Sequence, residues 1–461
     1  MNRNLYSCAL VAVAGVASLA ACGAPGATLT PSSASGSAPS VGRNVRPPNP
    51  FPIQHVVLMI QENRSFNDLF ATFPGAVGTT TGFMRTGSGK KAQSVPVALT
   101  KVPLLYKLDL NHVYPAWLQA YRNGNMDGFN LIQSGASGQP EGTKPYQYVN
   151  PMQIQSYWAL ARQYVLADHM FQTQGSGSFT AHQDLIRGAT DINSNQSLID
   201  YPTGAPWGCN APPNTQTSLI TTSLQYLKDK GPYPCLSYDT LQNLLDAKGV
   251  SWKYYTPSLG ATGSLWNAFL AINSVYSNKS EWNAHIASPE TSILTDISNG
   301  TLPQMSWVIP DALDSDHPDS PSDNGPSWIA SVVNAVGESS YWDSTAIVVV
   351  WDDWGGFYDP VKPPKRDEQG GPGFRVPAII ISPYVPSHKV AHTVFAFGSI
   401  LRFVEDAFRL GRLGTTDSTS TSIENVFDFG QKPRSFKMIP SARSREYFLL
   451  RKPSNLPVDT Q

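Results

Sequence analysis

Two apolar runs in this sequence, each followed directly by polar residues, are typical of buried parallel strands. Val56–Ile60 and Ala346–Trp351 are rich in Val, Ile and Leu and contain no charged residue. Continuous apolar runs of this length indicate strands that are buried on both faces, as in parallel sheets. Polar residues just past the carboxyl end of such a strand face the crevice in which open α/β sheets bind ligands. We therefore expect the chemistry at these two strand ends.

Other segments continue the alternation of strands and helices between about residues 53 and 427. The patterns predict strands at Val250–Tyr255, Met305–Pro310 and Val376–Ser382, and helices at Pro151–Leu166, Gln183–Arg187, Leu241–Ala247, Trp328–Val336 and Phe397–Phe408. This order predicts an α/β fold with a mainly parallel sheet. We expect a catalytic domain at 51–430 with an insertion around 193–301, and a tail at 431–461 that packs on the domain.

The first fifty residues predict export. Arg3 precedes an apolar stretch from Leu10 to Ala21 that is too short to cross a bilayer, so 1–21 is interpreted as a signal peptide. The residues around Cys22 resemble a bacterial lipobox, which predicts a lipid anchor there; an ordinary signal peptide with an incidental cysteine is the alternative. Residues 22–50 are rich in Ala, Ser, Gly and Pro and predict a flexible tether. The protein is thus expected on the periplasmic or outer face of a membrane, or secreted.

Composition excludes several classes. The chain has 461 residues and a formal net charge of -1, with no basic stripe, which argues against nucleic acid as a partner. Outside the first 22 residues the only cysteines are Cys209 and Cys235, which are expected to form a disulfide in an exported protein. A zinc site of the Cys/His type is disfavoured because there is no CxxC and because the one HxxxH pair, His388 and His392, has no cysteine nearby in the sequence.

The strand ends carry candidate metal ligands. Glu62 and Asn63 follow the first run, and Asp352 and Asp353 follow the second. Their oxygens suit a divalent cation such as Mg, Ca or Mn. Paired acidic residues also occur at surface turns, which is the alternative for the second pair on its own.

A third element, Gly175–His182, is rich in small and hydroxyl residues. Its glycines would let the backbone approach a ligand, and a hydroxyl at the start of a helix can lie beside a bound anion. Ser178 is therefore a candidate nucleophile. The alternative is that Ser178 caps a helix.

Together these elements resemble the bacterial phosphoesterase family, which includes non-haemolytic-type phospholipases C and acid phosphatases and belongs to the alkaline phosphatase superfamily. The resemblance extends over about residues 53–430, and five motifs carry it: Glu62–Phe66, Asn125–Phe129, the Ser178 turn, Asp316–Pro318 and Trp351–Asp359. It implies an alkaline phosphatase-like three-layer α/β/α sandwich.

The resemblance also implies roles for individual residues. Ser178 matches the nucleophile that also contacts the metal, and the remaining metal ligands match Glu62, Asn63, Asp352 and Asp353. His112 and His317 match pocket histidines that hold phosphate oxygens or protonate the leaving group. Arg64 is a candidate to stabilise the transition state, with a structural role as the alternative.

The chain departs from the family pattern in four places: at Asn67, at the pair Thr180 and Ala181, at Pro360, and at Ser178 itself, where phospholipases commonly carry threonine. The serine favours the acid phosphatase side of the family. The predicted function is therefore a metal-dependent phosphoesterase that forms a phosphoserine, foremost an acid phosphatase acting on a small phosphate ester.

Two alternatives stay open. The first is a phospholipase C or phosphodiesterase, in which aromatic residues of the insertion would shape a lipid pocket or else belong to the core; these are Trp207, Tyr233, Trp252, Tyr254, Tyr255 and Trp266. The second is a surface lipoprotein that binds a phosphorylated ligand or a partner without turnover. The sulfatase motif Cys-x-Pro-x-Arg does not occur.

Overall fold

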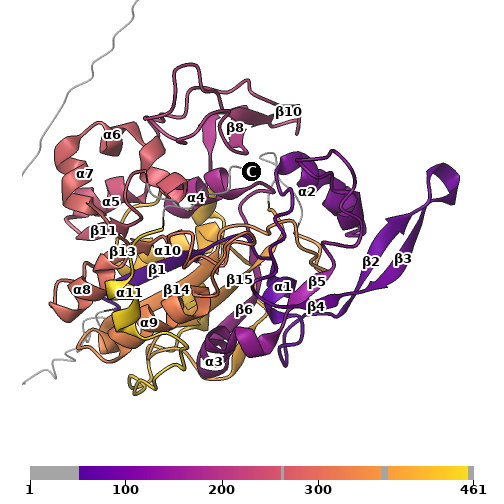
Figure 1. Ribbon diagram of the computed structural model, residues 1–461. Helices are drawn as coiled ribbons and strands as arrows, with labels where there is room; N and C mark the ends of the chain where they lie inside the picture. The colour runs from indigo at the N-terminus through magenta and orange to yellow at the C-terminus, as the bar shows by residue number, and fades with distance from the viewer. Residues whose placement is uncertain (1–50, 261–263, 365–371, 455–461) are drawn as a thin grey trace, which may run out of the picture. The chain divides into compact units, whose positions relative to one another are not determined.

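The central element of the fold is a nine-stranded, mainly parallel sheet (Figure 1). The computed structural model describes residues 51–260, 264–364 and 372–454, so the predicted signal peptide, tether and Cys22 anchor lie outside the described residues. The strand order is β12-β11-β13-β1-β14-β15-β6-β16, and β17 also pairs with β6. The strands are β1 (His55–Gln61), β6 (Val165–Phe171), β11 (Trp252–Tyr255), β12 (Ile286–Ala287), β13 (Met305–Val308), β14 (Thr345–Trp351), β15 (Arg375–Ile381), β16 (Lys389–Ala391) and β17 (Phe395–Ala396).

The sheet confirms the strands predicted from the apolar runs. β1 lies between β13 and β14 and is parallel to both, with Leu58 opposite Trp307 on one side and Val348 on the other. All residues of β14 are buried, as expected for a strand covered on both faces. The exception to the parallel order is β15, which runs antiparallel to both β14 and β6.

Helices cover both faces of the sheet, which gives three layers (Figure 1). Trp307 and Val348 both pair with Leu58 and therefore point to one face, whereas Trp351, three residues further along β14, points to the other. Trp307 donates to the Leu185 carbonyl of α4, and Trp351 contacts the ring of Tyr157 of α3. The two groups of helices are α4 (Ser178–Arg187), α5 (Leu241–Lys248) and α10 (Phe397–Ala407) on the Trp307 face, and α3 (Gln155–Gln163), α8 (Ser292–Ser298), α9 (Gly325–Gly337) and α11 (Arg445–Leu450) on the Trp351 face.

Smaller elements surround this sandwich. The remaining described α-helices are α1 (Phe66–Phe70), α2 (Tyr114–Tyr121), α6 (Asn273–Tyr276) and α7 (Lys279–His285). Two small sheets pair β2 (Thr81–Thr86) with β3 (Gln93–Ala98) and β4 (Thr100–Val102) with β5 (Gln147–Val149). None of the described helices has the length and apolar run that a membrane span requires.

The segment predicted as an insertion, 193–301, divides into two parts. Its first part forms an antiparallel sheet in the order β10-β9-β8-β7, made of β7 (Asp191–Asn193), β8 (Gln196–Ile199), β9 (Ser218–Thr221) and β10 (Tyr226–Leu227). Its second part returns to the central sheet, because β11 pairs in parallel with β13 and β12 with β11. β11 confirms the strand predicted at Val250–Tyr255, but the sequence did not show that it belongs to the central sheet, and the two-residue β12 has no apolar pattern of its own.

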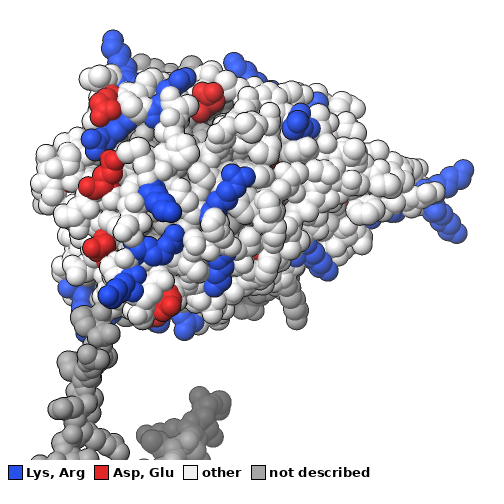
Figure 2. All heavy atoms as spheres, turned by 90° about the horizontal axis from the view of Figure 1, so that it is seen from below, with Lys and Arg blue, Asp and Glu red and all other residues white. Residues whose placement is uncertain are grey.

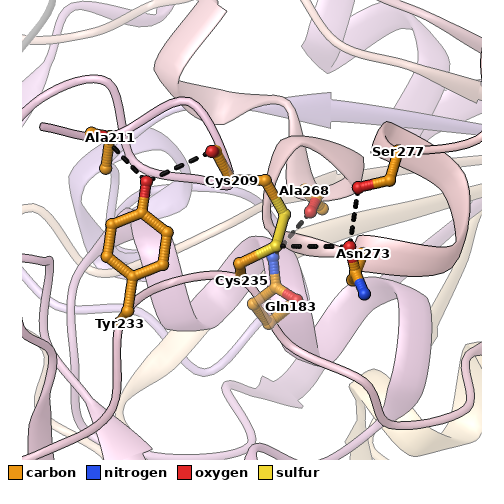
Figure 3. Close-up of a disulfide and its surroundings, with 8 residues drawn as sticks. All are labelled: Gln183, Cys209, Ala211, Tyr233, Cys235, Ala268, Asn273 and Ser277. Atoms are coloured by element: carbon orange, nitrogen blue, oxygen red, sulfur yellow. Dashed lines mark hydrogen bonds between the residues drawn. A yellow bond between two sulfur atoms is a disulfide. The ribbon is translucent and has the colours of Figure 1, made fainter. Parts of the chain in front are cut away.

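The disulfide predicted between Cys209 and Cys235 is present (Figure 3). The hydroxyl of Tyr233 donates to the carbonyl oxygens of Cys209 and Ala211, so it ties the two ends of the disulfide loop together. Five of the six aromatic residues that were candidates for a lipid pocket are buried in the hydrophobic core, and Tyr233 is half-buried in this loop. These positions favour a structural role for the six side chains.

The surface carries charges of both signs. On the face shown in Figure 2, Lys and Arg side chains are more frequent than Asp and Glu side chains, and uncharged residues cover most of the surface between them.

Candidate active site

The ends of β1 and β14 bring the four predicted metal ligands side by side. The two strands are paired in register up to Gln61 opposite Trp351, so the next two residues of each strand leave the sheet at the same edge. The amide of Asn63 donates to Oδ1 of Asp352 at 2.9 Å. Glu62, Asn63, Asp352 and Asp353 are all fully buried. The predicted neighbourhood of these two pairs therefore exists.

Ser178 lies against the same group. Its Oγ is 3.1 Å from Oδ2 of Asp353 and 3.5 Å from Oδ1 of Asn63. The sequence predicted a turn at Ser178 and a helix from Gln183, but α4 already begins at Ser178, and Gly177 is its N-cap residue. Ser178 is therefore not a capping side chain, and its hydroxyl is directed to the carboxylate of Asp353. The turn before it needs glycine, because a Cβ on Gly175 would lie 2.2 Å from the ring of Trp117.

His112 orients Asn63. Its Nδ1 lies 2.6 Å from the Leu110 carbonyl, which can only accept, so Nδ1 carries the proton. In the neutral ring Nε2 then has no proton, and it accepts a hydrogen bond from Nδ2 of Asn63 at 3.0 Å. This bond turns the Asn63 oxygen toward Ser178. The geometry therefore supports a positioning role for His112 in addition to the pocket role implied by the family resemblance.

His182 is a site residue that the sequence reasoning missed. It lies four residues after Ser178 on α4, and its Nε2 is 3.1 Å from Oε1 of Glu62 and 3.7 Å from Oδ2 of Asp352. Burial lowers the pKa of His182 to about 4, and the charge of Asp352 only partly opposes this shift, so the ring is neutral. The signal was available, since residues four apart share one face of a helix.

This group of side chains fits a divalent cation. One ligand atom each from Glu62, His182 and Asp352 lie within 4.8 Å of one another. Oδ2 of Asp352 and Nδ1 of His182 are buried without a hydrogen-bond partner. Burial, and then the charge of Asp352, raise the pKa of Asp353. Three buried carboxylates beside a neutral histidine are stable only with compensating positive charge, and oxygen donors with one imidazole provide a suitable shell.

The guanidinium of Arg64 is bound by other groups of the protein, so it is not a free cation that could bind a phosphate oxygen. Its Nε and Nη2 donate to the Asp316 carbonyl at 3.0 and 2.9 Å, and its Nη1 donates to Oδ2 of Asp68 at 3.0 Å. The guanidinium also lies over the ring of Phe357. These contacts favour the structural alternative for Arg64, in which it fixes the segment that carries Asp316 and His317.

His317 follows Asp316 on the loop after β13. Its Nδ1 is 2.6 Å from Oδ1 of Asp319, and its ring is stacked near Trp266, with 5.8 Å between centroids. The side chain is 1% exposed, whereas that of Asp319 is 52% exposed. The carboxylate of Asp319 fixes the orientation of the ring.

Three successive contacts fasten this loop to the end of β1. Nε2 of Gln61 donates to the Asp314 carbonyl, the amide of Glu62 donates to the Ser315 carbonyl at 2.9 Å, and Arg64 binds the Asp316 carbonyl. On its other side the loop is held by Arg451, which follows α11.

Arg451 is the cation in a buried acidic cluster. Its Nη2 lies 2.9 Å from Oδ2 of Asp311, 2.7 Å from Oδ2 of Asp314 and 3.7 Å from Oε1 of Glu290. The carboxylates of the two aspartates are fully buried and that of Glu290 is 1% exposed. The C-terminal segment is therefore attached to the loop that carries His317, and Phe448 of α11 is also buried against Trp328.

Comparisons with a family model, with curated relatives and with solved structures find several similar proteins. The model of the Phosphoesterase family matches residues 53–411. Phospholipase C B of Mycobacterium tuberculosis is 27% identical over 443 residues, covering 84% of this chain and 79% of the relative. Hemolytic phospholipase C of Pseudomonas aeruginosa is 25% identical and covers 77% of this chain and 53% of its own length. A solved structure of a protein in the alkaline phosphatase superfamily from Vibrio parahaemolyticus has 12% identity and a TM-score of 0.36, covering 81% of this chain and 72% of its own.

Proposed function

Because the chain belongs to the phosphoesterase family and is a hydrolase acting on phosphate esters, we propose that it works by attack of Ser178 on phosphorus, through a phosphoserine intermediate. The observation that carries this proposal is the position of the Ser178 hydroxyl, 3.1 Å from Asp353 and beside Asn63, at the edge where β1 and β14 end. Nucleophilic serines are activated in such surroundings by a base or a cation.

Each residue of the site has a task in this mechanism. Glu62, Asn63, His182, Asp352 and Asp353 would hold a divalent cation. When bound, it would polarise the phosphoryl oxygens and lower the pKa of the attacking hydroxyl. Ser178 loses its proton to water and its oxygen forms the bond to phosphorus on the side opposite the leaving oxygen, whose own bond to phosphorus breaks.

The two histidines, His112 and His317, have different roles. His112 keeps the amide oxygen of Asn63 turned toward Ser178 through its own Nε2. His317, oriented by Asp319, protonates the leaving oxygen. Water then attacks the phosphoserine from the same side, with His317 as the base.

The substrate that we propose is a phospholipid phosphodiester, as for a phospholipase C. The support is that curated relatives named phospholipase C align with most of this chain. A phosphomonoester substrate, as for an acid phosphatase, is the second candidate, and it is favoured by serine in place of threonine at position 178. Turnover of neither substrate would support the third reading, a lipoprotein that only binds.

The test is steady-state hydrolysis of phosphatidylcholine and of a phosphomonoester by the wild-type protein and by Ser178→Ala, with and without chelator. We expect chelator-sensitive turnover that falls at least about 10³-fold in the variant, equivalent to about 4 kcal/mol of transition-state stabilisation. Ser176→Ala is the matched control, because Ser176 is also buried in this turn but hydrogen-bonds Asp200 and Thr180. Equal rates for Ser178→Ala and wild type would contradict the mechanism.

Export and anchoring are also part of the proposal. We propose that the chain is exported and lipid-modified at Cys22, and the disulfide supports an oxidising compartment. Intact mass of the mature protein tests this: a diacylglyceryl mass on Cys22 is expected, and an unmodified chain that begins at another residue would refute it.

A further inference from the structure

The edge of the central sheet contains a bulge next to a buried carboxylate. β6 pairs on its outer side with β16 and then with β17, and Ala391 lies opposite Ala167 while Phe395 lies opposite Met170. Three residues, 392–394, therefore lie opposite the two residues Asp168 and His169. One extra residue in an edge strand is a β-bulge, and bulges re-aim side chains.

Two histidines meet the Asp168 carboxylate at this bulge. Nδ1 of His169 lies 2.7 Å from Oδ1 of Asp168, and Nδ1 of His392 lies 3.0 Å from each of the two carboxylate oxygens. The amide of Val77 also donates to Oδ2 at 2.9 Å, which fixes the carboxylate. The Asp168 side chain is fully buried, whereas those of His169 and His392 are 20% and 57% exposed. The three groups thus form a polar centre that opens to solvent on one side.

We propose that Asp168, His169 and His392 form a binding site for a divalent transition-metal ion of the Zn²⁺ type, separate from the candidate active site. One ligand atom from each residue lies within 4.8 Å of the other two. Two imidazole nitrogens and one carboxylate oxygen form a donor set that favours Zn²⁺, Ni²⁺ or Cu²⁺ over Mg²⁺ and Ca²⁺.

The distances agree with this class of ion. Ligand bonds of about 2.0–2.2 Å in tetrahedral geometry put neighbouring ligand atoms about 3.3 Å apart. Each imidazole Nδ1 lies 2.7 to 3.0 Å from the carboxylate, and the ligand atoms of all three residues lie within 4.8 Å of one another, so an ion would require only a small movement of the two rings. The His392 side chain is 57% exposed, so water can reach the three groups.

A bound ion would connect three segments that are distant in sequence. β6 provides Asp168 and His169, the bulge provides His392, and the loop at Val77 is attached through the carboxylate. The ion would therefore fasten the last strands of the sheet to β6.

The experiment counts ions. The mature wild-type protein is stripped with chelator and dialysed against Zn²⁺ alone, and the bound ions per chain are compared with those of His392→Ala. We expect His392→Ala to hold one ion fewer and to keep wild-type hydrolytic activity. His388→Ala is the matched control, because His388 is an exposed histidine four residues away and should leave the number of ions unchanged.

A second measurement makes the result independent of the active-site ions. The Co²⁺ absorption spectrum of Ser178→Ala is compared with that of Ser178→Ala combined with His392→Ala, and the difference should be the spectrum of one nitrogen-ligated ion. His169→Ala should remove the same component. The proposal is overturned if His392→Ala binds as many Zn²⁺ ions as wild type, or if the two Co²⁺ spectra are identical.

Discussion

Arg451→Gln should destabilise the protein strongly, because it removes the cation that the buried acidic cluster contains. The two aspartate carboxylates that Arg451 binds are fully buried, and the arginine side chain itself is 10% exposed. Removing one partner of a buried ion pair costs about 3–5 kcal/mol, because the other charge stays buried without compensation. With an unfolding entropy of about 2.1 cal/mol/K per residue over roughly 400 residues, this is a fall in Tm of about 4–6 °C.

The loss should depend on pH. Burial, and then the neighbouring carboxylates, raise the pKa of Glu290 to about 8 and that of Asp314 to about 7, whereas Arg451 lowers both. An acid with a raised pKa in the folded state contributes stability that is complete below its unfolded pKa, near 4, and is lost as the pH rises through 7 to 8. At pH 6 both groups are mostly protonated and Arg451 has less charge to balance. The difference between wild type and variant should therefore be larger at pH 8.5 than at pH 6.

The assay is thermal unfolding at both pH values, together with kcat and KM well below Tm. Arg443→Gln is the matched control, because this arginine lies in the same segment but its partner Asp323 is 3.9 Å away and both side chains are about half exposed; such a pair contributes about 0–1 kcal/mol. Since the cluster holds the loop of His317, we also expect a lower kcat. Equal Tm values for Arg451→Gln and Arg443→Gln, or a smaller loss at pH 8.5 than at pH 6, would refute the reasoning.

Three further predictions concern the site and the disulfide. His182→Ala should weaken binding of the active-site cation about 10-fold to 100-fold in a chelator competition. His55→Ala, at the other end of β1, is the control and should leave the cation affinity unchanged. Equal cation affinities for His182→Ala and wild type would exclude His182 as a ligand. In His112→Gln the new side chain can still accept a hydrogen bond from Asn63, so this variant should have a higher kcat than His112→Ala. A lower kcat for His112→Gln than for His112→Ala would contradict a positioning role for His112. Reducing the disulfide, which spans 26 residues, should lower the free energy of unfolding by about 3.5 kcal/mol in denaturant titrations, and a double serine variant should not respond to the reductant.

The sequence was sufficient to predict the parts of the fold that depend on local pattern. The apolar runs at Val56–Ile60 and Ala346–Trp351 are long and continuous, so both strands and the polar residues after them could be placed. The rule that parallel strands end at one edge placed both polar pairs at the same edge of the sheet, but the direct pairing of β1 with β14 is a finding of the structure. The two-residue strand β12 has no pattern of its own, and its pairing with β11 depends on tertiary packing.

Side-chain direction was harder to predict than position. His182 was visible in the sequence, but its contact with Glu62 could be foreseen only with a helix that begins at Ser178 and not at Gln183. Arg64 follows two metal-ligand candidates directly, yet its guanidinium turns to the Asp316 carbonyl. Arg451 lies 137 residues after Asp314, and no local signal connects them.

The antiparallel direction of β15 has a consequence for how this protein can diverge. β14 ends and β15 begins at the same edge of the sheet, so the connection that starts with Asp352 and Asp353 leaves and returns on the side of Ser178. A parallel neighbour would need a crossover to the opposite edge. A change in the length of this connection after Asp359 therefore need not alter the path of either strand, whereas its first residues are fixed by burial and by the ion pair of Asp359 with Arg375. Substrate preference can change there by loop replacement, and the same connection is a practical place to graft new specificity.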